Sequence, residues 1–245
     1  MIESFIFISP CTDVFIDNPT ERLHGALIKT IASKFSIEKI HGPSRDRFSL
    51  SLIYDLSLAS VRHFKKGETY FFRITSMSDD IHIGFLKQLA LNPKLKLRDV
   101  DFEVIEVRTA TEFNFDESIM DTIYFISPTT FRISKNQNLP LPDPERIARN
   151  LSNLLGVAVD LPPLKEACIK TKAVSFAKHV VIGFTGYVRF DKPLRELHLF
   201  HFAGMGYSTA RGLGSVIVRG VVPLDEEVSR RHQRFMNHEA KRCRE

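Results

Sequence analysis

Apolar residues in the first half of the chain repeat at two different spacings. Alternating or continuous short apolar runs predict four strands, at residues 4–9, 47–54, 68–76 and 102–108. Leu23, Leu27 and Ile31 recur at the spacing of one helix face, and Asn18 and Pro19 before them are typical of a helix start. A second helix is predicted from Ser78 to the residue before Asn92.

The second half of the chain repeats this order of elements. Asp143 followed by Pro144 predicts a helix start, and Gly156 predicts its end. We expect the apolar residues Ile147, Leu151, Leu154 and Leu155 to face inward. The other predicted elements are a strand at 122–133, a hairpin of 170–176 with 180–190, a helix at 194–202 and a last strand at 214–221.

Each half therefore approximates β-α-β-β-α-β, the ferredoxin-like pattern that RNA-recognition sheets share. The sequence predicts an α+β protein of two tandem ferredoxin-like domains, residues 1–118 and 119–222, with a charged tail at 223–245. For the tail we expect a solvated or frayed terminal helix. A further RNA contact or a dimer element is the alternative for this segment.

Composition adds a mild basic excess to this picture. The 245 residues carry a net charge of +5, which is compatible with a polyanionic partner. Cys11, Cys168 and Cys243 form no CxxC pair, so three reduced thiols are expected. The N-terminus does not have the pattern of a signal peptide, and no run of residues has the length of a membrane helix. We expect a soluble cytoplasmic protein without a membrane partner.

The most specific pattern is a glycine-rich segment at residues 204–216. Two glycine-apolar-glycine triplets flank five residues, and no GK[ST] follows, so it is not a nucleotide-binding P-loop. Closely spaced glycines let a backbone approach a ligand and turn N–H groups toward an anion. The alternative is that they only make tight turns. The residues predicted to bind phosphate are Gly204, Gly206, Ser208, Thr209, Arg211, Gly212 and Gly214.

This segment resembles the C-terminal glycine-rich loop of the CRISPR repeat-processing endoribonucleases of the RAMP superfamily. Four shorter stretches also resemble that family, at residues 22–27, 40–51, 127–132 and 141–144. The resemblance covers most of residues 1–222. It implies an enzyme that binds a CRISPR repeat stem-loop and cuts it when the RNA's own 2′-hydroxyl attacks the adjacent phosphate. The products are a 2′,3′-cyclic phosphate and a 5′-hydroxyl, and neither a metal nor another cofactor is required.

Such a reaction needs a base, an acid and a positive charge near the phosphate. Histidine suits the proton transfers because its reference pKa is ~6.5. The resemblance implies that His41 is a catalytic residue, and His24 on the first predicted helix is the second candidate, with packing at the helix edge as its alternative. Lys39 is the candidate charge, although an exposed solubilising lysine is the more common role for a single lysine in such a position. Some family members use a tyrosine in the first helix, which this helix does not contain.

Basic residues in the second half suggest a path for RNA. The resemblance implies that the predicted hairpin grips the base of the stem, so Lys170, Lys172 and Lys178 are expected to bind RNA, as is Arg132. The alternative is an ordinary edge strand protected by lysines.

Histidines elsewhere in the chain show no catalytic or metal-binding pattern. His198 and His201 lie three residues apart, but no cysteine or acidic partner accompanies them in sequence, so helix packing is expected. No metal site is predicted. His232 and the other histidines show no constellation either.

Two rival functions stay open at this level. One is a non-catalytic RNA-binding RAMP subunit of a CRISPR effector complex, and the other is a structural subunit that joins a protein complex through its charged tail. A metal-dependent nuclease is less favoured, since the close carboxylate pairs at residues 79–80 and 99–101 are typical of helix starts or loops. Assembly with other CRISPR effector subunits and a homodimer are further partners to consider.

Overall fold

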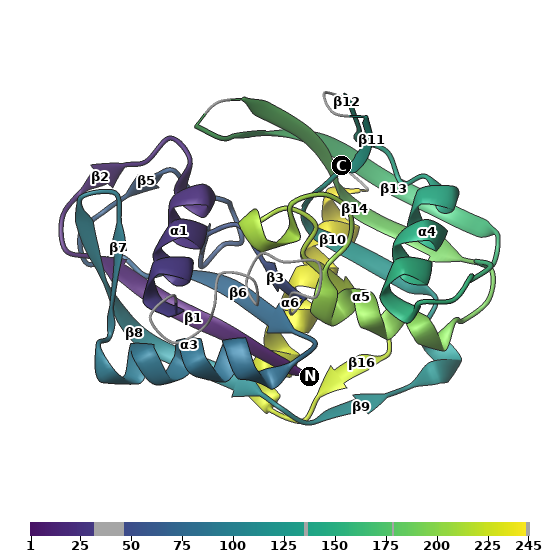
Figure 1. The fold of residues 1–245 in the computed structure, drawn as a ribbon, viewed down its shortest axis with the longest axis horizontal. Helices are drawn as coiled ribbons and strands as arrows, with labels where there is room; N and C mark the ends of the chain where they lie inside the picture. The colour runs from purple at the N-terminus through teal and green to yellow at the C-terminus, as the bar shows by residue number, and fades with distance from the viewer. Residues whose placement is uncertain (32–46, 135–136, 178, 244–245) are drawn as a thin grey trace.

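A computed structural model of the chain describes residues 1–31, 47–134, 137–177 and 179–243. Its two main β-sheets lie side by side, each with helices on one face, and a long C-terminal helix runs behind the junction between them (Figure 1). The two-domain ferredoxin-like α+β architecture predicted from the sequence is confirmed by this arrangement.

The first sheet has the strand order β3-β6-β1-β8-β7, with β4 paired to the end of β6. All its pairings are antiparallel. The strands are β1 (Ile2–Pro10), β3 (Phe48–Leu50), β4 (Tyr54–Asp55), β6 (Tyr70–Ser76), β7 (Lys94–Leu97) and β8 (Val100–Ala110). A small ribbon beside it pairs β2 (Val14–Phe15) with β5 (His63–Phe64).

Helices α1 (Pro19–Ile31) and α3 (Asp79–Leu91) cover one face of this sheet. The predicted stripe of Leu23, Leu27 and Ile31 is buried, as the spacing indicated. Asn18 precedes α1 and donates from its side-chain amide to Oε2 of Glu21 at 2.7 Å. The helix start that the sequence predicted therefore forms, although the two side chains bond to each other and not to the backbone N–H groups of the helix start.

The second sheet has the order β13-β14-β10-β15. The chain enters it through a short 3-10 helix, η1 (Glu117–Ile119). Its strands are β10 (Thr122–Thr129), β13 (Leu164–Ser175), β14 (Val180–Phe190) and β15 (Val216–Val218), again all antiparallel. Two small ribbons pair β11 (Phe131–Ser134) with β12 (Gln137–Leu139) and β9 (Phe113–Phe115) with β16 (Val221–Pro223). Helices α4 (Pro144–Leu155) and α5 (His198–Ala203), the latter after the 3-10 helix η2 (Arg195–Leu197), pack on one face of the sheet.

Helix α4 begins and ends where the sequence predicted. Asp143 Oδ1 accepts a hydrogen bond from the Arg146 N–H at 3.1 Å, and Gly156 closes the helix in the left-handed conformation with φ of 75°. Ile147 and Leu151 are buried, but the expectation that Leu155 faces inward is wrong, since it is 37% exposed. Leu155 is the last helical residue, so the apolar stripe has already turned toward solvent there.

The predicted hairpin is confirmed and is longer than the sequence indicated. β13 and β14 pair continuously from Ala167 opposite Val188 to Ser175 opposite Val180. The far end of the hairpin extends beyond the second sheet toward α1 of the first domain (Figure 1).

The charged C-terminal segment is an integral part of the fold, so the expected solvated or frayed tail is wrong. Helix α6 (Glu226–Arg242) begins at Asp225, whose Oδ1 accepts from the Val228 N–H at 2.8 Å. Val228 and Phe235 are buried in one apolar cluster with Phe5 and Phe71 of the first sheet and with residues of the second sheet. The apolar face of α6 is narrow and most residues of the segment are charged, so the sequence pattern did not indicate that this face packs against the two sheets.

The expectation of three reduced cysteines is also wrong for two of them. Cys168 of β13 and Cys243 at the end of α6 form a disulfide, with their Cα atoms 5.8 Å apart. Cys11 is free. Because the two cysteines are 75 residues apart, their pairing depends on where the helix packs and no spacing motif could indicate it.

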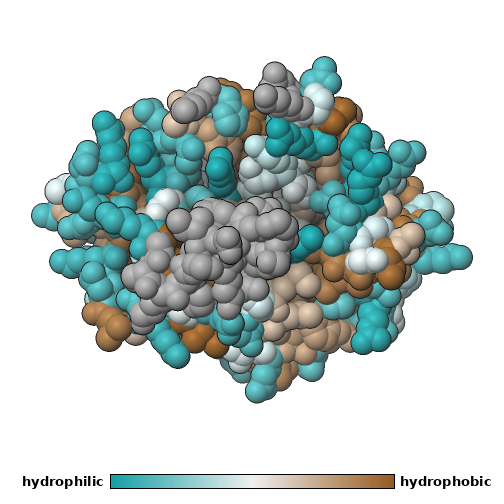
Figure 2. Space-filling model, in the orientation of Figure 1, coloured by the Kyte–Doolittle hydropathy of each residue, from teal (hydrophilic) through white to brown (hydrophobic). Residues whose placement is uncertain are grey.

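Side chains over β9 and β16 form a region of neutral to hydrophobic surface in the lower middle of Figure 2. Phe115 and Val222 in these strands are exposed. No helix in the described part of the chain is both long enough and apolar enough to span a lipid bilayer.

Candidate nucleic-acid interface and catalytic region

The glycine-rich segment, residues 204–216, runs from the end of α5 into the start of β15 and lies against the first domain. Its short 3-10 helix η3 (Thr209–Arg211) packs beside α1 and β3. Gly212 has φ of 90°, and a β-carbon there would overlap the side chain of Thr20 in α1. Gly214 has φ of 67°, and a β-carbon there would overlap the carbonyl of Met205. These glycines are therefore required for close packing of the loop, whatever else it binds.

Most N–H groups of the segment already donate to protein acceptors. The N–H of Gly206 donates to Oδ1 of Asn150 at 3.1 Å, and that of Gly214 donates to the Pro128 carbonyl at 3.0 Å. The others that donate within the protein belong to Gly204, Met205, Tyr207, Arg211, Gly212 and Leu213. Phosphate binding by this loop stays a prediction, and it would depend on the side chains of Ser208 and Arg211 more than on the glycine amides.

Two basic side chains stand at the surface of the loop. The guanidinium of Arg132 lies over the ring of Tyr207, 5.3 Å from its centre, and Arg132 is exposed. Arg211 is exposed as well, and its charge helps to lower the pKa of Glu21. Burial alone would raise that pKa, but the Ala177 N–H, the Asn18 amide and the positive charges of Arg211 and Arg22 outweigh it. The structure thus places the loop, the start of α1 and the hairpin end together.

His24 lies on α1 one turn after Glu21 and is half-buried. Its ring stacks near that of Phe48 in β3, with 6.5 Å between the ring centres. His24 is therefore on the side of α1 that faces β3, and η3 packs beside these same two elements. His41, Lys39 and Lys178 lie outside the described residues.

The two described lysines of the hairpin have different surroundings. Lys170 is exposed, whereas Lys172 is half-buried and donates to Oγ of Ser60 in the first domain at 2.6 Å. Burial, with the nearby charge of Arg242, lowers the pKa of Lys172. The prediction that both lysines bind RNA is not decided by these positions, but Lys172 faces the first domain and not open solvent.

Sequence reasoning missed a buried charged cluster where the domains meet. Glu3 of β1 accepts from Nε of Arg73 at 2.6 Å and from Nε2 of His232 at 2.7 Å through one oxygen. Its other oxygen accepts from Nε2 of His201 at 2.9 Å. All four side chains are buried, so the expected lack of an acidic partner for His201 and of any constellation at His232 is wrong. The partners come from β1, β6, α5 and α6, and sequence separations of up to 229 residues hide them.

The three residues Glu3, His201 and His232 offer ligand atoms within 4.8 Å of one another, a spacing that could hold a metal ion. Arg73 already supplies the positive charge there, because its Nη2 lies 2.8 Å from His201 Nε2 while its Nε binds Glu3. A metal would have to displace a fully buried guanidinium from its carboxylate. The cluster is therefore better described as an ion pair that joins the domains than as a metal centre.

Protonation in this cluster follows from its contacts. Burial would raise the pKa of Glu3, but Arg73, with His232 and His201, holds it well below its ordinary value. Burial, with the neighbouring charge of Arg73, lowers the pKa of His201 to about 3. The Val218 N–H donates to Nδ1 of His201 at 3.3 Å, which leaves the ring proton on Nε2 to donate to Glu3. His201 is thus neutral, and hydrogen bonds at both ring nitrogens fix its orientation. A buried ring held in this way does not suit transfer of a proton to or from a substrate.

Comparison with known proteins supports a single family. Residues 123–216 match the family model of the CRISPR-associated endoribonuclease Cas6. This match includes β10, the hairpin and the glycine-rich segment, and it confirms the resemblance drawn from that segment. No curated protein matches the chain in sequence.

Solved structures match over nearly the whole fold. A Cas6-related protein from Pyrococcus furiosus aligns with a TM-score of 0.71 at 15% identity, covering 89% of this chain and 98% of that one. A product complex of Cas6 from Thermus thermophilus aligns at 0.69 and 21% identity, covering 89% and 99%. An RAMP protein that binds different RNA substrates aligns at 0.66 and 14% identity, also covering 89% and 99%. At these identities the likeness shows a shared fold.

Proposed function

We propose that the chain is a member of the Cas6 family of RAMP proteins, that it binds CRISPR repeat RNA and that it cuts the precursor once per repeat. The observation that supports this most directly is the match over residues 123–216, which includes the glycine-rich segment. Neighbours of the same fold are a Cas6 product complex and an RAMP protein that binds different RNA substrates. We also propose the division into domains at 1–118 and 119–222.

The proposed reaction uses no metal. One histidine takes the proton of the RNA 2′-hydroxyl, which attacks the adjacent phosphorus, and a second acid protonates the leaving 5′-oxygen. His24 and His41 are the proposed pair, and Lys39 is the proposed positive charge near the phosphate. His24 lies on α1, the helix that η3 contacts. A strand lying over the glycine-rich segment would therefore pass close to His24.

The proposed RNA surface runs from this segment to the hairpin. Arg211 and Arg132 stand on and beside the loop, and both are exposed. Tyr207 lies beneath the Arg132 guanidinium and adds an aromatic face on which a base can stack. The proposed hairpin contacts are Lys170, Lys172 and Lys178.

Cleavage of a stem-loop repeat RNA in EDTA tests this proposal. Wild type should cut once and leave a 2′,3′-cyclic phosphate, and a substrate with 2′-deoxyribose at the scissile nucleotide should resist. His24→Ala and His41→Ala should each bind the RNA but lose about 100-fold or more in single-turnover rate. His63→Ala is the matched control, because His63 is exposed on β5 in the same domain.

The outcomes separate the rival functions. Binding without cleavage by wild type would favour the non-catalytic RNA-binding subunit of an effector complex. Negligible RNA binding at any salt concentration would favour a structural subunit. Loss of cleavage in EDTA that Mg²⁺ restores would contradict the metal-independent mechanism. Sedimentation of the full chain with and without RNA would test the homodimer.

A further inference from the structure

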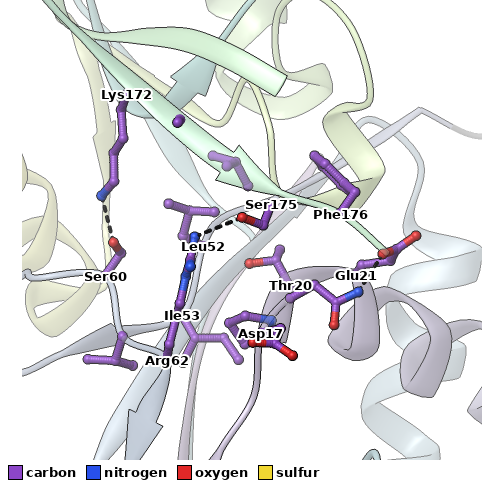
Figure 3. A pocket seen from close by; sticks show the side chains of 15 residues that line it. Asp17, Thr20, Glu21, Leu52, Ile53, Ser60, Arg62, Lys172, Ser175 and Phe176 are labelled. Atoms are coloured by element: carbon purple, nitrogen blue, oxygen red, sulfur yellow. Dashed lines mark hydrogen bonds between the residues drawn. The ribbon is translucent and has the colours of Figure 1, made fainter. Parts of the chain in front are cut away.

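The far end of the hairpin closes onto the first domain over a cavity. The cavity has a volume of about 100 Å³. One wall is the start of α1 with residues 52–53, and the other is residues 172–176 of β13 and the hairpin end. Figure 3 shows the side chains of Lys172 and Arg62 approaching it from opposite domains.

Both cations are held by neutral hydroxyl groups. Lys172 Nζ donates to Ser60 Oγ at 2.6 Å, and Arg62 Nη2 donates to Ser175 Oγ at 3.2 Å. Each contact joins the two domains. Among the described residues, neither cation has a carboxylate within ion-pair distance. A serine hydroxyl carries no negative charge, so these hydrogen bonds leave the positive charges of Lys172 and Arg62 without a counterion, and an anion could supply one.

Neighbouring charges make this place more positive. Arg242 of α6 and Arg62 both disfavour the charged form of Lys172, and Glu239 favours it. Glu239 already accepts from Arg242 at 3.2 Å, so its charge is largely shared with that residue. Asp17 and Glu21 also line the cavity, but Glu21 bonds to Asn18 and to the Ala177 N–H at the other end.

We propose that Arg62 and Lys172 together bind a backbone phosphate of one RNA strand between the hairpin and the first domain. This inference rests on the proposed function and adds a second anion site to it. An anion would relieve the repulsion between the two cations and would give each of them a charged acceptor, which binds a cationic donor more strongly than a neutral hydroxyl does. The cavity volume of about 100 Å³ is smaller than the roughly 300–1,000 Å³ of pockets that hold whole small molecules, so the site would take one phosphate group and not a complete nucleotide.

Salt-dependent binding of a non-cleavable repeat RNA tests the site. The RNA carries 2′-deoxyribose at the scissile nucleotide, and Kd is measured from low to high salt for the full-length protein. Arg62→Gln combined with Lys172→Gln should lower the slope of log Kd against log salt by roughly 0.7 for each phosphate that the protein no longer neutralises. It should also weaken binding at physiological salt by roughly five- to tenfold.

Two further variants make the result specific. Lys94→Gln with Lys96→Gln removes the same charge from exposed positions of β7 and should leave the slope unchanged. Arg62→Lys with Lys172→Arg keeps both charges and should preserve most of the slope. Thermal unfolding of each variant checks that the domains still fold together.

Each result decides between sources of the anion. A wild type that cuts repeat RNA while the neutral double variant keeps the wild-type slope would overturn this site and the hairpin contact of Lys172, and would leave the proposed cleavage reaction standing. A wild type that does not bind repeat RNA would overturn both the site and the proposed function. If millimolar inorganic phosphate raises the Tm of wild type but not of the neutral variant, and the RNA slope is unchanged, the site takes free phosphate and the RNA assignment fails.

Discussion

Glu3 is a single residue on which the stability of a whole buried cluster depends. Its carboxylate is inaccessible to solvent and accepts from Arg73, His201 and His232. Without the Glu3 carboxylate, the Arg73 guanidinium would be a buried charge with neither a counterion nor water around it, and this would destabilise the folded state. The cluster therefore stabilises the fold only as a complete set.

Replacement of Glu3 by glutamine tests this dependence. Glu3→Gln should lower the free energy of unfolding by about 3–5 kcal/mol, because Arg73 loses its counterion and the new amide meets histidine donors. Chemical denaturation gives the value. Glu103→Gln, at an exposed position of β8, should change it by less than about 0.5 kcal/mol. A loss below about 1 kcal/mol at Glu3 would show that the cluster is not a coupled set.

Because His201 and His82 are buried, we expect the free energy of unfolding to fall in mild acid. Burial is the main cause that lowers the pKa of His201 to about 3 and that of His82 to about 4. The unfolded chain therefore takes up these protons first, at about pH 6.5, so the stabilisation is complete above that pH and falls as the pH drops toward the folded values. Each histidine should cost about 2 kcal/mol at pH 5.

Denaturation curves of wild type and His82→Gln at pH 7 and pH 5 measure this effect. The wild type should lose about 4 kcal/mol between the two conditions, and the variant about half of that. Glu3 acts at lower pH, since its pKa lies well below 4.5 and its stabilisation is lost only as the pH falls through that value. Equal stability at pH 7 and pH 5 would contradict the assignment of both rings as neutral.

Individual site residues were only partly predictable. His24 and the loop residues could be selected because their neighbours in sequence form a recognisable segment. Glu3, Arg73, His201 and His232 could not, because each is unremarkable locally and only the meeting of two sheets and α6 brings them together.

The glycine-rich segment has a structural role in packing against α1, whether or not it also binds a ligand. Gly212→Ala should destabilise the protein by more than about 2 kcal/mol, because the new β-carbon overlaps Thr20 and φ is 90°. Gly25→Ala in α1 is the matched control, since a β-carbon there meets open space, and it should stabilise by about 1 kcal/mol. Thermal unfolding compares the two. A Gly212→Ala protein as stable as wild type would mean that the loop can move away from α1.

Elements with local signals were predicted well. The start and end of α4 depend on Asp143 and Gly156, which act within one turn of the helix. The hairpin follows from two β-rich runs around a short turn. α6 was identified as a terminal helix but misjudged as solvated, because its apolar face of Val228 and Phe235 is too sparse to be recognised among so many charges.

Helix α6 packs against both sheets, so we expect the two domains to unfold together as one cooperative unit. Phe235 packs against Phe5 at 6.3 Å and Tyr54 at 5.3 Å between ring centres, within a cluster that includes Ile126 and Ile217 of the second sheet. Phe235→Ala should therefore cost about 3–5 kcal/mol and lower one shared unfolding transition. Gln233→Ala, exposed on the same helix, should change little. Two separate transitions in the wild type would contradict this unity.

The tandem ferredoxin-like architecture was predictable because each half repeats its order of elements. How the halves join was not, since the Cys168–Cys243 disulfide, the Glu3 cluster and the packing of α6 all depend on segments distant in sequence.

The contact between Glu3 and His232 also has a consequence for synthesis on the ribosome. The partner of the first strand lies 229 residues later in the chain. At roughly 5–20 residues per second, that helix follows the first strand by about 10–50 s. During this interval α6 does not yet cover the aromatic face of the first sheet around Phe5 and Phe71, which a chaperone can bind, and this apolar cluster is complete only when α6 has been synthesised.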